Sequence, residues 1–152
     1  MKSTVANHRD VALAACAATV PLLREARLND VAAQLDEITS LALSGDDETV
    51  FAMARKLPQG DIADFWDPLD WDLEDQLPLE RRALITAYYW ATWRALVNWR
   101  VAKSYDFDRE VVDVEPRSLA TVAEGLLAQQ KARHAQPNPL FQPTPNGAAE
   151  RN

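Results

Sequence analysis

A run of carboxylates interleaved with aromatic rings occupies residues 61–75. Carboxylates at this density can coordinate a cation, transfer protons or attract a positively charged surface. Tryptophan is favoured as an anchor at protein interfaces. The run holds seven acidic residues, two tryptophans and no basic residue, and its candidate binding residues are Asp61, Asp64, Trp66, Asp67, Asp70, Trp71, Asp72, Glu74 and Asp75.

Cation binding in this run lacks the spacing that a calcium loop requires. Asp70, Asp72 and Glu74 alternate like the first three ligands of such a loop. The glycine that must follow the third ligand is missing, and no bidentate glutamate follows at the right distance; the chain continues instead with Gln76, Leu77 and Pro78. We therefore predict no bound metal and no other cofactor.

Catalysis has little support from the remaining residue types. The two histidines, His8 and His134, lie near the start and the end of the helical part of the chain, and we expect both at the surface. The sequence has no glycine-rich phosphate loop, no nucleophile elbow, no HExxH and no CxxC pair. We predict that the protein is not an enzyme, although acid–base chemistry by carboxylates alone stays open as an alternative.

The element best suited to position the acidic run follows it directly. Pro78 suits a helix start, and Glu80 places negative charge at the positive end of the helix dipole. No proline or glycine interrupts the chain until Pro116, so we expect one long helix over about 79–104. A helix of that length spans roughly 39 Å. Its aromatic residues are Tyr88, Tyr89, Trp90, Trp93 and Trp99.

Apolar residues surround this predicted helix on several faces, which is typical of an inner helix or of a membrane span. Only 17 residues separate Arg82 from Arg100, and Arg94 lies among them. A membrane span needs about 20 mostly apolar residues with few charges, so we predict no membrane insertion. We expect Arg94 to reach the surface or to pair with a carboxylate.

The charges of the two neighbouring segments are opposite. Residues 81–105 contain five basic and no acidic residues, namely Arg81, Arg82, Arg94, Arg100 and Lys103. In one interpretation the acidic run folds against this helix, and Phe65, Trp66 and Trp71 complete its core. In the other, the acidic run faces outward and offers carboxylates with aromatic anchors to a basic partner. The sequence leaves both open.

The remaining helices are marked by turn and capping residues. We expect the first over 3–19, with Pro21 either kinking it or opening a short segment over 21–28. Asn29 and Asp30 are candidates for the N-cap of the second helix, and Gly45 for its C-terminal residue. The other expected elements are a second helix over 31–44, a third over 48–57 capped by Asp46 and Asp47, two short segments over 61–66 and 69–76, an ordered loop over 106–115 and a last helix over 116–134.

Together these patterns predict an all-α protein. We expect a compact single-domain bundle of about five to seven helices over 1–135, arranged around the helix at 79–104. The tail, 136–152, contains four prolines and one apolar pair, Leu140–Phe141, and should be extended or disordered.

Composition narrows the partners and the compartment. The net charge of −7 argues against direct nucleic-acid binding, which favours a basic surface. Cys16 is the one cysteine, so no internal disulfide can form, and we expect its thiol buried in the first helix. The apolar stretch before Cys16 is too short for a signal peptide, which leads us to expect a cytoplasmic protein.

These expectations favour a small acidic protein that binds a basic partner protein. Inhibitors, immunity proteins and antitoxins have this profile, and residues 61–75 would supply the acidic and aromatic contact surface. A structural or adaptor subunit, including a homodimer, is an alternative, because the aromatic residues are numerous for one small core. An enzyme with a carboxylate-based site in a helical fold is the third hypothesis.

Overall fold

The computed structural model of the chain describes residues 5–58, 77–105 and 110–135, and they form five helices without a strand. The predicted all-α class is therefore confirmed for this part of the protein. The proposed contact residues of 61–75 and the tail at 136–152 lie outside the described residues.

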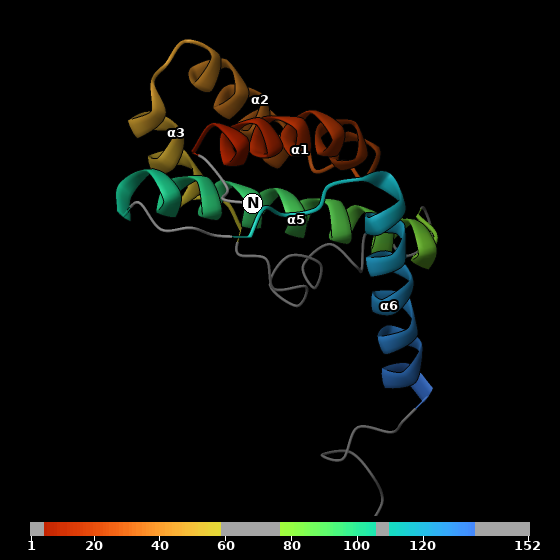
Figure 1. Cartoon of the computed structure of the whole chain (residues 1–152). Helices are drawn as coiled ribbons and strands as arrows, with labels where there is room; N and C mark the ends of the chain where they lie inside the picture. The colour runs from red at the N-terminus through yellow and green to blue at the C-terminus, as the bar shows by residue number, and fades with distance from the viewer. Residues whose placement is uncertain (1–4, 59–76, 106–109, 136–152) are drawn as a thin grey trace, which may run out of the picture.

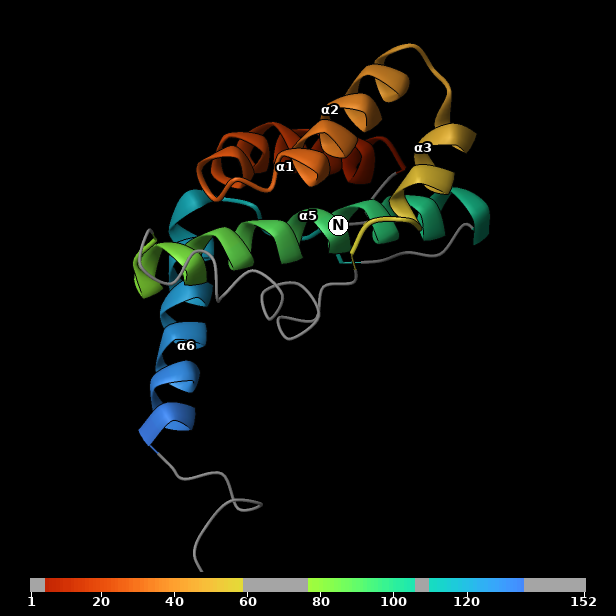
Figure 2. The same cartoon turned by 180° about the vertical axis from the view of Figure 1, so that it is seen from behind.

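Four helices pack around the longest helix: two of them cover one of its sides, and the other two lie near its two ends (Figure 1). Helix α5 (Leu79–Tyr105) lies beneath α1 (Val5–Glu25), and α2 (Asn29–Leu43) packs against α1. The short α3 (Asp47–Ala54) follows α2 in the chain and packs against the C-terminal part of α5. Helix α6 (Pro116–Ala135) packs across the N-terminal half of α5 and then points away from the other helices, as the reverse view shows (Figure 2).

Helix α1 continues through Pro21 to Glu25, beyond the expected end near residue 19, so Pro21 does not open a separate segment over 21–28. Proline has no N–H to donate to the carbonyl of Ala17. Both residues are exposed, so water can satisfy that carbonyl without ending the helix. The helix instead ends at a turn in which Arg27 adopts φ 62°, and the Leu28 N–H donates to the Leu23 carbonyl at 2.8 Å.

The ends of α2 follow the expected pattern at one terminus only. The helix starts at Asn29, two residues earlier than expected, and its N-cap is Leu28, which offers no side-chain cap. Asn29 and Asp30 therefore lie in the first turn. At the other end Gly45 has φ 88°, and the N–H of Asp46 donates to the Leu41 carbonyl at 3.0 Å, as a glycine-terminated helix requires.

Asp46 caps α3, and Asp113 stabilises the start of α6 in a related way. The Asp46 carboxylate accepts from the Thr49 N–H at 3.3 Å and from its hydroxyl at 2.7 Å. Residues 110–115 are not helical and return along α5 to Pro116, the first residue of α6 (Figure 1). There the Asp113 carboxylate accepts from the Glu115 N–H at 3.0 Å and from the Ser118 hydroxyl at 2.6 Å.

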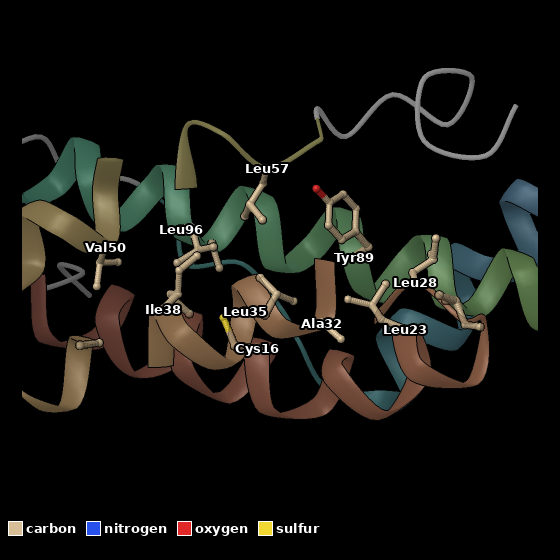
Figure 3. Packing of buried hydrophobic residues seen from close by; sticks show 14 of the residues in the cluster. Cys16, Leu23, Leu28, Ala32, Leu35, Ile38, Val50, Leu57, Tyr89 and Leu96 are labelled. Atoms are coloured by element: carbon tan, nitrogen blue, oxygen red, sulfur yellow. The ribbon is translucent and has the colours of Figure 1, made fainter. Parts of the chain in front are cut away.

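The main core lies where α1, α2, α3 and α5 meet (Figure 3). Trp99 is fully buried and meets Phe51 edge to face, with ring centroids 4.9 Å apart. A buried polar contact joins α1 to α5, since the hydroxyls of Thr19 and Thr92 are 2.7 Å apart. Core side chains labelled in the figure include Cys16, Leu23, Leu35, Ile38, Val50, Leu57, Tyr89 and Leu96.

A second, much smaller cluster holds α6 against α5. It consists of Ala83, Ala87 and Ala123, with Leu84, Leu126 and Leu127 half-buried beside them. None of the helices in the described part of the chain is long and apolar enough to cross a membrane.

Candidate binding surfaces

The structure describes the two ends of the segment that contains the acidic run. Leu57 and Leu77 are both buried in the main core. The hydroxyl of Tyr89, from the middle of α5, donates a hydrogen bond to the carbonyl of Pro58. Burial raises the pKa of this phenol, so Tyr89 stays a neutral donor. The segment is thus attached to the core on both sides.

Arg81 and Lys103 of α5 are paired with carboxylates of other helices. Arg81 makes a forked contact with Glu25 of α1, in which Nε and Nη2 lie 2.6 and 2.7 Å from the two carboxylate oxygens. This hydrogen bond holds the pKa of Glu25 below its ordinary value. Near the other end of α5, the Lys103 ammonium donates to Asp47 of α3.

Arg94 contacts an aromatic ring. Its guanidinium carbon lies 5.3 Å from the centre of the Trp90 ring, one helical turn earlier. Both side chains are exposed, and in the described part of the chain no carboxylate forms an ion pair with Arg94. Of the two sequence expectations for Arg94, surface exposure is confirmed.

Trp90 and Arg94 line a hollow of about 400 Å³, which we call the α5–α6 groove. One wall is α5, the second is the non-helical segment 110–113, and the third is the start of α6, with Leu119 and Val122. Trp90 is 37% exposed and Val122 39% exposed, so two large apolar side chains remain open to solvent here. Sequence reasoning did not predict this groove.

Asn98 fixes the second wall of the groove to α5. Its side-chain amide is only 4% exposed and donates to the carbonyl of Glu110 at 3.1 Å. Its Oδ1 atom is buried and accepts no hydrogen bond from any described residue. Trp90, Arg94 and Asn98 are spaced by four residues and therefore share one face of α5. That spacing is the signal by which the groove's first wall could have been found.

A smaller hollow of about 200 Å³ lies on another face of α5. It is lined by Arg55, which follows α3, and by Trp93 and Arg100 of α5. The lining contains two cations and no carboxylate. Its size suits a single small anion or one side chain.

The described residues bring together no obvious catalytic groups. His8, expected at the surface, is 2% exposed, because it lies on the face of α1 that packs inward. Burial raises the pKa of the Cys16 thiol to about 12, so it is not a reactive nucleophile at neutral pH. No group of three or more His, Cys, Asp or Glu side chains in the described ranges could hold a metal ion.

The chain matches no protein-family model, and no curated protein or solved structure is significantly similar to it. Its function must therefore be argued from its own residues.

Proposed function

We propose that this protein binds, and thereby neutralises, a basic partner protein through the acidic and aromatic residues of 61–75. The observation that carries the proposal is the pairing of Arg81 with Glu25 and of Lys103 with Asp47. Arg81 and Lys103 thus bind carboxylates outside 61–75, and the five basic residues of α5 are fewer than the seven acidic residues of 61–75. Because the acidic residues of 61–75 outnumber the basic residues of α5, α5 cannot pair with all of them, which supports an outward-facing role for the segment.

Attachment of both ends of the segment to the core also supports this proposal. Leu57 and Leu77 are buried, and Pro58 accepts a hydrogen bond from Tyr89. A recognition segment held at both ends loses less conformational entropy on binding than a free tail would. Complementary charge would accelerate the encounter and disfavour wrong partners.

The test is the triple charge reversal Asp67→Lys, Asp70→Lys and Asp72→Lys. Its matched control is Glu37→Lys, Glu80→Lys and Glu124→Lys, which changes the net charge equally at exposed positions of α2, α5 and α6. Wild type and both variants serve as baits for affinity capture from lysate, with mass spectrometry to identify captured proteins. Binding is then measured with purified components over a range of salt concentrations.

We expect wild type and the control to capture the same basic protein and the triple reversal to lose it. The affinity of the purified pair should fall as salt rises, because exposed charges are screened. Circular dichroism establishes that each variant is folded. Undiminished capture by a folded triple reversal would refute the acidic surface as the binding site.

A further inference from the structure

The smaller hollow, of about 200 Å³, lies between the end of α3 and one face of α5, and we call it the α3–α5 hollow. Its two charged lining residues are both arginines, Arg55 and Arg100, and no carboxylate is among the lining residues. In the described part of the chain neither arginine forms an ion pair with a carboxylate. The hollow therefore holds two uncompensated positive charges in a protein whose net charge is −7.

The described neighbours of the hollow do not neutralise these two arginines. Residues 81–105 of α5 include no acidic residue, and Asp47 of α3 pairs with Lys103 near the C-terminal end of α5. The backbone carbonyls at the end of α3 are also satisfied, since those of Phe51 and Ala54 each accept a backbone N–H. Both guanidiniums are thus available to an anion that enters from solvent.

The rest of the lining is apolar and is held in place by the main core. Trp93 and Ala54 are half-buried and pack against that core, and Leu96 is 1% exposed. Trp93, Val97 and Arg100 are spaced by four and three residues and therefore share one face of α5. An indole and aliphatic side chains beside guanidiniums suit a ligand with an anionic head group and an apolar body. Sites for drug-sized ligands measure roughly 300–1,000 Å³, so this body is a single ring or a short chain.

The number of arginines selects among anionic head groups. The planar fork of a guanidinium matches the oxygens of both a carboxylate and a phosphate. A carboxylate or a sulfate ester carries one negative charge. A phosphate monoester carries about −1.5 to −2 at pH 7, because its second pKa is about 6, and it has three acceptor oxygens. Two guanidiniums therefore match a phosphate monoester in charge and in hydrogen-bonding capacity.

From these observations we infer that the α3–α5 hollow binds a small-molecule phosphate monoester. Arg55 and Arg100 hold the phosphate, and the apolar part of the ligand packs against the ring of Trp93. This site is separate from residues 61–75 and does not rest on the function proposed for them.

The test uses the full chain labelled with nitrogen-15 and phenyl phosphate as the probe. A titration near pH 7.5 is followed through the indole N–H signals in two-dimensional NMR spectra, and Trp93→Phe assigns the signal of Trp93. We expect that signal to shift until it saturates and the signal of Trp90, which lines the other groove, to stay in place.

Two matched probes separate charge from shape. Phenyl sulfate has nearly the shape of phenyl phosphate with one negative charge, so it should bind at least about fivefold more weakly, and phenol should not bind. Near pH 5 the phosphate gains a proton, and phenyl phosphate and phenyl sulfate should then bind alike.

Arg55→Gln and Arg100→Gln should each weaken binding of phenyl phosphate about tenfold, because each removes a charge-assisted contact. Arg117→Gln is the matched control at an exposed position of α6 that lines neither hollow, and it should change the affinity less than about twofold. Arg100→Lys keeps the charge but loses the fork, so its affinity should lie between those of wild type and Arg100→Gln. Circular dichroism establishes that each variant is folded.

Each of four results would overturn the inference. The first is the absence of a saturable shift of the Trp93 signal up to about 10 mM phenyl phosphate. The second is equal affinity of wild type and Arg100→Gln. In the third, a peptide with phosphotyrosine binds more than about tenfold tighter than phenyl phosphate, because the ligand would then be a protein segment.

The fourth result is a gain in affinity of about tenfold when Asp67, Asp70 and Asp72 are reversed to Lys, because carboxylates of this chain would then occupy the hollow. We expect that reversal to leave the affinity for phenyl phosphate within about threefold of wild type. Capture of a basic protein from lysate is a separate measurement, so this inference and the proposed function fail independently.

Discussion

Two sides of α5 are built from side chains of different size. The side that faces α1, α2 and α3 buries Tyr89, Leu96 and Trp99, and a pair of hydroxyls joins it to α1. The side that faces α6 buries chiefly Ala83 and Ala87 and leaves Trp90 exposed. Alanines let two helices approach closely but bury little apolar surface. One helix thus has a side that stabilises the fold and a side available for contacts.

The largest expected difference is between two tryptophans of this helix. Trp99→Ala should lower the free energy of unfolding by about 3–5 kcal/mol, because it empties a fully buried site beside Phe51. Trp90→Ala should lower it by less, about 1–2 kcal/mol, because 37% of that side chain is already exposed in the folded protein. Urea denaturation of both variants measures the difference. Equal losses would show that the two sides of α5 stabilise the fold alike.

A smaller effect is expected from the buried hydroxyl pair. Thr92→Val removes the partner at 2.7 Å from Thr19 and should cost about 1–3 kcal/mol. Thr121→Val is the control on α6, where the exposed hydroxyl donates to the backbone carbonyl of Arg117, and it should cost less than about 0.5 kcal/mol.

Adding Thr19→Val to Thr92→Val completes a double-mutant cycle. The double variant should lose less than the sum of the two single variants, because each single variant leaves one buried hydroxyl without its side-chain partner. Strictly additive losses in urea denaturation would mean that the two hydroxyls do not stabilise each other.

Alkaline pH should lower the free energy of unfolding over a pH range that is set by the buried thiol of Cys16. Burial raises the pKa of the Cys16 thiol from 9.0 to about 12. Above pH 9 the unfolded chain therefore releases a proton that the folded chain retains, so stability falls as pH rises, by about 1.4 kcal/mol per pH unit once the unfolded thiol is ionised. Urea denaturation at intervals between pH 8 and pH 10.5 measures this slope.

Cys16→Ala should reduce the fall in the free energy of unfolding between pH 9 and pH 10, whatever its effect on stability at pH 7. Burial also raises the pKa of the Tyr89 phenol above its ordinary value of 10.0. Both proteins should therefore lose further stability at higher pH, where the unfolded phenol ionises. An unchanged slope in Cys16→Ala would assign the alkaline loss to other groups.

Features determined by neighbouring residues were predictable from the sequence, and features determined by packing were not. The all-α class, the glycine at the end of α2 and the Asp46 cap depend on local chain chemistry, and all three are confirmed. The burial of His8 depends on which face of α1 meets the other helices, and its expected surface position was wrong. Pro21 is tolerated within α1 because it faces solvent.

The α5–α6 groove shows the same division. The four-residue spacing of Trp90, Arg94 and Asn98 is visible in the sequence. The opposing walls come from residues 110–113 and from α6, and only tertiary packing brings them to that face. The contact residues proposed within 61–75 lie outside the described part of the chain, so their role stays a prediction.

The hydrogen bond from Tyr89 to Pro58 has a mechanical consequence. It ties the start of the 59–76 segment to the midpoint of the longest helix, while Leu77 ties the other end to the same core. A force applied to the two ends of that segment would act on the main core and not on a terminus of the chain. Tension applied at Pro58 and Leu77, for instance with optical tweezers, would therefore load the main core before it loads either terminus.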